Sequence, residues 1–134
     1  MAETHTDKRP LSPHLQIYRP MLTMMMSIMH RITGSALYFG IILLVWWLTA
    51  AAISADYFAI VQAFFGHWFG KLVLFGFTWA LLHHMLGGLR HLLWDTGHGF
   101  KLSTIEWLAR LNLASSIIFT VVLWLGVYWV RGTL

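Results

Sequence analysis

Long uninterrupted apolar runs dominate the hydrophobic pattern of this chain. Three of them stand out, over about residues 33–53, 72–93 and 111–130. Each run is close to the ~20 residues that a helix needs to cross ~30 Å of hydrocarbon. The runs are continuous rather than alternating, which excludes the strands of an outer-membrane barrel. The pattern therefore predicts an all-α membrane protein with three transmembrane helices.

The stretch before the first apolar run has a different character. All three prolines of the chain fall within residues 1–20, and proline interrupts a helix everywhere except in its first turn. We therefore expect an irregular N-terminal arm over residues 1–20 and a three-helix anchor domain over residues 21–134. The first helix is expected to begin near Met21, with Pro20 suited to its first turn.

Composition supports a membrane protein and narrows its chemistry. The chain is 58% hydrophobic and 10% charged, whereas soluble domains carry about 25% charged residues. It has no cysteine, which excludes disulfides, thiolate nucleophiles and thiolate ligation of an iron–sulfur cluster. Eight histidines are many for 134 residues, and imidazole is a common metal ligand. The net charge of +4 comes mainly from a shortage of acids, so no nucleic-acid partner is expected.

Lysine and arginine are unevenly distributed among the segments that connect the spans. They occur before the first span and around the second connection (Lys8, Arg9, Arg19 and Arg31; Arg90, Lys101 and Arg110). The first connection, over residues 54–70, has none, and the C-terminal tail has only Arg131. Because basic residues accumulate on the cytoplasmic side, we expect the N-terminus in the cytoplasm and the C-terminus in the periplasm.

The beginning of the chain bears on the compartment. No apolar run follows the first residues directly, unlike in a secretory signal. Glu3 and Asp7 disfavour a mitochondrial presequence, which is poor in acids. We therefore expect a multi-pass protein of the bacterial inner membrane, with a mature organellar protein as the alternative.

Two polar clusters are expected to meet at one membrane depth. Ser27, His30 and Arg31 share a face at the start of the first helix, since they are three and four residues apart. Arg90, His91 and Asp95 occupy the end of the second helix. Antiparallel packing of these two helices would bring the clusters together at the cytoplasmic side. Snorkelling of ordinary end residues, or an ion pair of Asp95 with an arginine, is the alternative for this cluster.

A second pattern lies deeper in the second helix. His84, Gly88, His91 and Asp95 step by four, three and four residues and form one stripe. At 1.5 Å per residue the stripe rises about 16 Å toward the bilayer centre. An ionisable residue at such a depth is a functional candidate, and the adjacent glycines leave room for a flat ligand such as haem. His83 points ~100° away and could simply bond a neighbouring helix.

These residues carry a resemblance to a known family. The chain contains RPLSPHL at 9–15, SIMHRIT at 27–33 and HMLGGLRHLLWDTG at 84–97. In order, spacing and placement, these motifs resemble those of the succinate dehydrogenase cytochrome b556 subunits, the larger membrane anchors of respiratory complex II. The resemblance extends over essentially the whole chain.

The resemblance implies a role within an assembly. The expected partners are a second membrane anchor, an iron–sulfur subunit, a flavoprotein subunit and the lipid bilayer. Electrons from succinate would pass through iron–sulfur clusters to ubiquinone, and haem b would lie between the two anchors. His84 matches the axial haem iron ligand, with the second axial histidine supplied by the partner anchor. The remaining matched positions are haem-propionate residues (His30, Arg31 and His91) and quinone-site residues (Ser27, Arg31 and Asp95).

Three other functions remain to be weighed against this one. The chain could be a purely structural anchor without a functional haem, or the anchor of a quinol:fumarate reductase, which differs mainly in physiological direction. A small transporter or proton channel is disfavoured, because the outer half of the second helix offers only Thr78 as a polar group.

Overall fold

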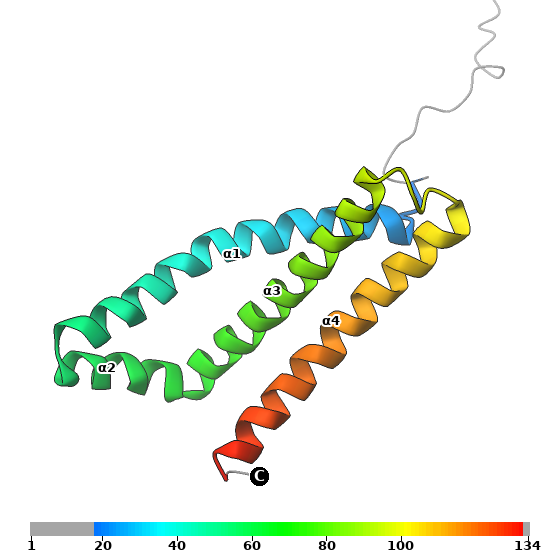
Figure 1. Cartoon of the computed structure of the whole chain (residues 1–134). Helices are drawn as coiled ribbons and strands as arrows, with labels where there is room; N and C mark the ends of the chain where they lie inside the picture. Colours follow the sequence, from blue (N-terminus) through cyan, green and yellow to red (C-terminus); the bar gives the residue numbers. More distant parts are fainter. Residues whose placement is uncertain (1–17, 133–134) are drawn as a thin grey trace, which may run out of the picture.

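The computed structural model describes residues 18–132, which form four helices and, within that range, no strand. The helices are α1 (Leu22–Ile53), α2 (Ala55–Gly66), α3 (Trp68–Asp95) and α4 (Leu102–Val130), as Figure 1 shows. α1, α3 and α4 are long and apolar enough to cross a membrane. The prediction of an all-α protein with three membrane spans is confirmed. The RPLSPHL motif and most of the predicted N-terminal arm lie outside the described residues.

The long helices extend beyond the predicted apolar spans. α1 has 32 residues, which at 1.5 Å per residue is about 48 Å and exceeds the hydrocarbon thickness. Its N-cap is Met21, close to the expected start. The sequence had suggested that Pro20 lies in the first turn of this helix. It lies before the N-cap instead. The polar cluster around His30 consequently belongs to the same continuous helix as the first apolar span.

The connection between the first two spans contains a helix, α2, which the sequence had not predicted. The Ser54 side chain caps α2 by accepting a hydrogen bond from the Tyr57 backbone N–H. Val61 and Phe65 are buried one helical turn apart and pack with Ala50 at the end of α1. Hydropathy alone did not reveal α2, because its 12 residues are too few to cross a membrane.

The helices alternate in direction, as Figure 1 shows. α1 begins at the end of the molecule where α3 finishes, and α4 runs back so that its last turn lies at the opposite end. Between α3 and α4 the chain reverses through Gly97 and Gly99, whose φ angles of 79° and 85° suit glycine. The antiparallel pairing of α1 and α3 is therefore as expected, while the side of the membrane that each end faces stays a prediction.

The helices contact one another mainly through small residues. The buried positions include glycines, alanines and hydroxyl residues of all three long helices (Thr33, Gly40 and Ala50; Gly70, Ala80 and Gly87; Ala109, Ser116 and Thr120). Small side chains let helix backbones approach closely, which is how transmembrane helices pack without a hydrophobic driving force. Buried hydroxyls bond carbonyls of their own helix, as Thr120 does with Ser116 at 2.7 Å.

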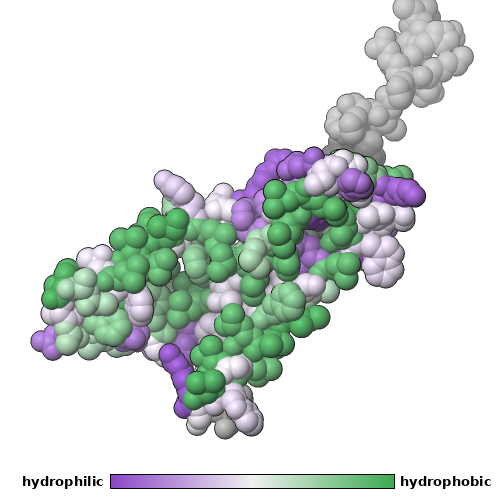
Figure 2. Space-filling view, in the orientation of Figure 1, coloured by the Kyte–Doolittle hydropathy of each residue, from purple (hydrophilic) through white to green (hydrophobic). Residues whose placement is uncertain are grey.

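Most of the apolar surface of the helices remains uncovered. Figure 2 shows hydrophobic residues over the helices, with hydrophilic ones gathered where α1 begins and α3 ends. Exposed large apolar side chains run along every long helix, among them Phe39, Leu89 and Ile118. In a soluble protein such a surface would cause aggregation, so it is suited to contact with lipid and with partner helices.

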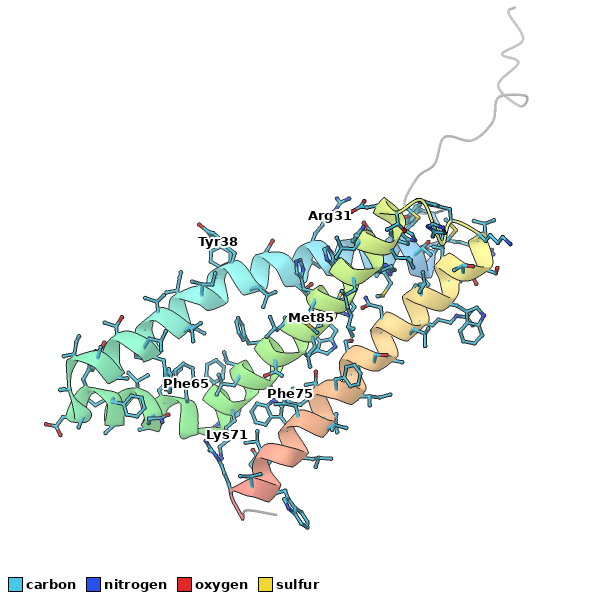
Figure 3. The ribbon with its side chains drawn as sticks, viewed as in Figure 1. Arg31, Tyr38, Phe65, Lys71, Phe75 and Met85 are labelled. Carbon is cyan, nitrogen blue, oxygen red and sulfur yellow. The ribbon has the colours of Figure 1, made fainter. Side chains whose placement is uncertain are left out.

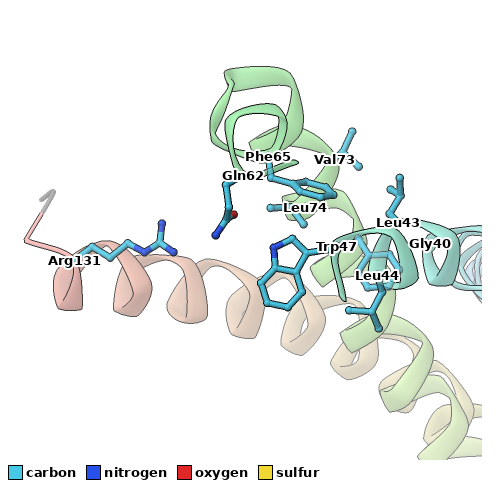
Figure 4. Close-up of a pocket in the computed structure, with 10 residues that line it drawn as sticks. Gly40, Leu43, Leu44, Trp47, Gln62, Phe65, Val73, Leu74 and Arg131 are labelled. Carbon is cyan, nitrogen blue, oxygen red and sulfur yellow. The ribbon is translucent and has the colours of Figure 1, made fainter. Parts of the chain in front are cut away.

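An apolar cavity of about 300 Å³ lies toward the α2 end, between α1, α2, α3 and the end of α4. Figure 4 shows its walls, which include Trp47, Phe65 and Leu74, with Gln62 and Arg131 as polar members. No histidine lines it. This cavity is therefore separate from the polar clusters predicted from the sequence.

Gly70 provides a test of the junction between α2 and α3. A Cβ atom at this position would overlap the Phe64 carbonyl oxygen and the Phe65 Cα, which are backbone atoms and cannot rotate away. We expect Gly70→Ala to destabilise the protein by about 1–3 kcal/mol through overpacking. Thermal unfolding of the purified protein in mild detergent measures this, and Gly76→Ala is the matched control, because open space surrounds Gly76. Equal unfolding temperatures of the two variants would contradict the expectation.

Candidate functional site

Three histidines meet where α1 and α3 cross near the hydrophilic end. The rings of His30 and His84 stack with centroids 4.0 Å apart and planes 12° apart. The His91 ring lies 5.1 Å from that of His30. Of the two polar clusters predicted to converge, His30 and His91 are brought together, and His30 of α1 lies between the two α3 histidines.

The position of a backbone carbonyl determines how His84 presents its ring. Its Nδ1 lies 3.1 Å from the His30 carbonyl oxygen and 3.5 Å from Thr33 Oγ1. A carbonyl oxygen only accepts hydrogen bonds, so Nδ1 must carry the proton and donate. The neutral ring then has its lone pair on Nε2, which has no hydrogen-bond partner within residues 18–132. This tautomer can bind a metal through Nε2.

Stacking leaves that nitrogen accessible. His30 covers a face of the His84 ring, whereas a metal binds an imidazole at its edge, in the plane of the ring. His84 is only half-buried. The arrangement is therefore compatible with an iron atom coordinated from outside the chain.

Glycines on both helices permit these contacts. A Cβ at Gly87 would overlap the His30 ring, and a Cβ at Gly34 would lie 2.9 Å from His84 Cε1. Gly88, in contrast, has open space around it. The expectation that both α3 glycines leave room for a ligand is thus corrected for Gly87, whose space the His30 ring fills.

The two histidines next to His84 differ in their surroundings. His30 is half-buried, and its Nε2 is buried without a hydrogen-bond partner in the described structure. His91 is exposed and packs its ring edge-on against Trp94. The His30 Nε2 atom is thus enclosed between α1 and α3, next to Gly87, whereas His91 remains open to other molecules.

The other predicted site residues surround this cluster more loosely. Ser27 is half-buried and Asp95 is exposed at the last position of α3. Arg31 is exposed and projects outward, as Figure 3 shows. Within residues 18–132 the ion pair that forms is Glu106–Arg110. The alternative, an ion pair between Asp95 and an arginine, is therefore not formed among the described residues.

His83 and Arg90 face α4 instead of α1. The His83 side chain is fully buried, with Nδ1 3.3 Å from the Ser116 hydroxyl oxygen. Arg90 lies 5.0 Å from the centre of the Trp94 ring and lines a groove with Asn112 of α4. The interhelical bond considered for His83 is confirmed, and Arg90, which the sequence placed in the polar cluster at the end of the second span, lines the groove against α4.

Thr33 and Gly34 are contacts of His84 that sequence reasoning missed. Both follow His30 by about one helical turn, so they lie beside the His30 carbonyl. The signal available was their position at the end of the SIMHRIT motif, but a threonine and a glycine in an apolar run are usually packing residues. Only the crossing of α1 and α3 identifies what they touch.

Fold and site together define a class of protein. Three apolar helices hold a half-buried histidine whose Nε2 is free to bind a metal, close to the hydrophilic end of the bundle. Within residues 18–132, no group of three or more His, Cys, Asp or Glu side chains could hold an ion by itself. The class is a helical membrane protein with three candidate spans and a cluster of histidines near its hydrophilic end.

Comparisons with known proteins identify the family. A model described as the succinate dehydrogenase/fumarate reductase transmembrane subunit matches residues 5–125. The chain is 44% identical over 121 residues to a succinate dehydrogenase cytochrome b556 subunit of Paracoccus denitrificans, covering 90% of this chain and 93% of the relative. The chain belongs to the succinate dehydrogenase/fumarate reductase transmembrane subunit family.

Two further relatives show the breadth of this similarity. A cytochrome b556 subunit of Rickettsia typhi is 37% identical over 118 residues, with 88% of this chain and 92% of the relative covered. A cytochrome b560 subunit of Marchantia polymorpha is 41% identical over 103 residues, with 72% of this chain and 74% of the relative covered. The bacterial relatives agree with the expected location in a bacterial inner membrane.

The bond between His83 and Ser116 predicts a structural role that mutation can isolate. The Ser116 hydroxyl donates to the Leu113 carbonyl at 2.9 Å, so it accepts from His83 Nδ1. We expect Ser116→Ala to lower stability by about 0.5–1.5 kcal/mol, because a buried donor loses its acceptor. Thermal unfolding in detergent measures this loss. Ser115→Ala is the control, since Ser115 is half-exposed, and an equal loss there would refute the assignment.

Proposed function

We propose that this chain is the membrane anchor of a succinate:ubiquinone oxidoreductase, and that it binds haem b together with a second anchor subunit. The observation that carries the proposal is the geometry of His84, whose Nδ1 is bound to the His30 carbonyl while Nε2 is free. Family membership supports the same conclusion, because the bacterial relatives bear the name cytochrome b556 subunit. The flavin and iron–sulfur chemistry belongs to the other two partner subunits.

His84 would be the single axial ligand that this chain contributes. A haem b supplies a reversible one-electron carrier when bound. The partner anchor would provide the second axial histidine, so neither chain alone completes the site. The open space around Gly88, four residues after His84 on the same helix, supports close approach of a flat ring system.

The residues around His84 are suited to the haem propionates. These carboxylates are anions and prefer hydrogen-bond donors and positive charge near the membrane surface. His30 lies between His84 and His91 and is half-buried, and His91 and Arg31 are exposed at the same end of the molecule. We assign these three side chains to orienting the propionates.

Ser27, Arg31 and Asp95 would form part of the ubiquinone site. Reduction of a quinone to a quinol takes two electrons and two protons. The Ser27 hydroxyl can donate a hydrogen bond to a quinone carbonyl. Arg31, always protonated, can hold the negative charge that develops on the quinone oxygen. Asp95, exposed and free of an ion pair in the described residues, is placed to exchange protons with water.

The uncovered surface supports assembly with further subunits. Exposed large apolar residues on α1 and α3, such as Ile32, Met85 and Leu92, lie at the same end as the histidines. A second anchor packed there would cover them and bring its own histidine toward His84. The basic N-terminal half of α1 and the α3–α4 connection then face the cytoplasm, where the iron–sulfur and flavoprotein subunits bind.

A quinol:fumarate reductase anchor is the second candidate, since the family description includes fumarate reductases. The relatives named succinate dehydrogenase subunits favour succinate oxidation as the physiological direction. A purely structural anchor is disfavoured, because a histidine that served only for packing would have no need of an accessible Nε2.

His84→Ala tests the ligand assignment. We expect the b-type signal in the reduced-minus-oxidised absorption spectrum to disappear, because the substitution removes an iron ligand. The measurement is haem per assembled complex, purified in gentle detergent with its subunits identified by mass. His83→Ala is the matched control, because the neighbouring histidine bonds Ser116 instead. An unchanged signal in His84→Ala, or an equal loss in His83→Ala, would contradict the assignment of His84 as an iron ligand.

Arg31→Ala tests the quinone site. Loss of a hydrogen bond from a charged donor costs about 1.5–3 kcal/mol, so we expect succinate-dependent quinone reduction to fall by about ten- to a hundredfold. Succinate oxidation measured with an artificial dye should survive, because it bypasses the membrane anchor. Arg110→Ala, which removes an exposed arginine paired with Glu106, should leave both rates unchanged. Equal loss of both activities in Arg31→Ala would indicate failed assembly and contradict the assignment.

A further inference from the structure

The His30 carbonyl accepts a hydrogen bond from another helix, and the Thr33 hydroxyl lies beside it. His84 Nδ1 lies 3.1 Å from this oxygen, and Thr33 Oγ1 lies at the same distance. The carbonyl is thus the point where α3 is attached to α1 through the candidate ligand. A backbone oxygen cannot be removed by substitution, so its role has to be tested through the side chains that surround it.

Thr33 is placed to share the proton of the His84 ring. Its hydroxyl oxygen lies 2.8 Å from the Met29 carbonyl, closer than to the His30 carbonyl at 3.1 Å. With its proton directed at Met29, the hydroxyl presents a lone pair to His84 Nδ1 at 3.5 Å. The residue is 2% exposed, so water does not replace this contact. The ring proton is therefore held by a near carbonyl and, more weakly, by a hydroxyl.

Gly34 is placed to let the ring reach that carbonyl. A Cβ at this position would lie 2.9 Å from His84 Cε1 and 3.4 Å from Nδ1. Any side chain at residue 34 would therefore displace the imidazole at the atoms closest to its hydrogen bonds. Of the two glycines that lie against histidine rings here, Gly34 is the one in contact with His84, since Gly87 accommodates His30.

We propose that Thr33 and Gly34 are positioning residues that fix the orientation and proton of His84, so that the ring presents Nε2 with raised basicity. The inference rests on the proposed haem ligation by His84. A hydrogen bond from Nδ1–H to an acceptor makes the imidazole a stronger electron donor, which stabilises the oxidised iron and lowers its reduction potential. Weakening the bond therefore raises the midpoint potential of the haem.

Two substitutions at Thr33 distinguish the effect of its hydroxyl from the effect of its side-chain volume. Thr33→Val keeps the volume and removes the hydroxyl, whereas Thr33→Ser keeps the hydroxyl. In purified complex that retains its haem, we expect Thr33→Val to shift the midpoint potential to higher values and to alter the g values of the low-spin EPR signal. Thr33→Ser should keep the wild-type potential and spectrum. An equal shift in both variants would attribute the effect to packing and overturn the role of the hydroxyl.

Gly34→Ala tests the contact itself. We expect a larger upward shift of the potential than in Thr33→Val, or loss of haem from an assembled complex, because the ring is pushed away from its acceptors. Gly126→Ala is the control, since it makes the same change on α4 with open space around it. Wild-type potential and EPR spectrum in both Gly34→Ala and Thr33→Val would overturn the proposal. Ligation by His84 would be unaffected by that result, since it is decided by His84→Ala alone.

Discussion

Hydrocarbon offers no hydrogen-bond partner, and this constraint organises the protein. Every polar group within the three long helices must be satisfied by the chain, by water at the membrane surface or by another molecule. Thr33, Thr78 and Thr120 meet the requirement by bonding carbonyls of their own helices. The histidines meet it by bonding across helices, and those bonds hold α3 between its two neighbours. Several buried side-chain atoms, among them His30 Nε2 and His83 Nε2, have no hydrogen-bond partner within residues 18–132.

Neighbouring residues of α3 point in different directions and therefore contact different helices. His83 and His84 are consecutive, and the ~100° rotation per residue of a helix directs them to different neighbours. His83 is fully buried against α4 and holds that helix through Ser116. His84 meets α1 and keeps a nitrogen accessible. Two adjacent residues of the same type thus make different contacts, His83 with α4 and His84 with α1.

The chain also shows how incomplete a membrane subunit is by itself. Its helices touch through small residues, and few large apolar side chains are buried within it. The end closed by α2 has a small apolar core around Ala50 and Val61, whereas the opposite end concentrates polar residues and leaves His84 half-buried. The end that α2 closes is therefore the better packed of the two, and the proposed haem and quinone sites lie at the other end. This division suits a subunit that assembles around a shared prosthetic group.

The sequence by itself determined the number of spans, their order and the residues that carry charge in apolar surroundings. Continuous apolar runs and the four-three-four spacing of His84, Gly88, His91 and Asp95 were sufficient, because both patterns are local. α2 escaped prediction, because its 12 residues are too few for a membrane span and its apolar residues do not gather on one face. Tertiary structure alone decided that His30 fills the space at Gly87, that Arg90 turns toward α4, and that Thr33 and Gly34 surround the His84 ring. Those contacts depend on where two helices cross, and a crossing joins residues more than fifty positions apart.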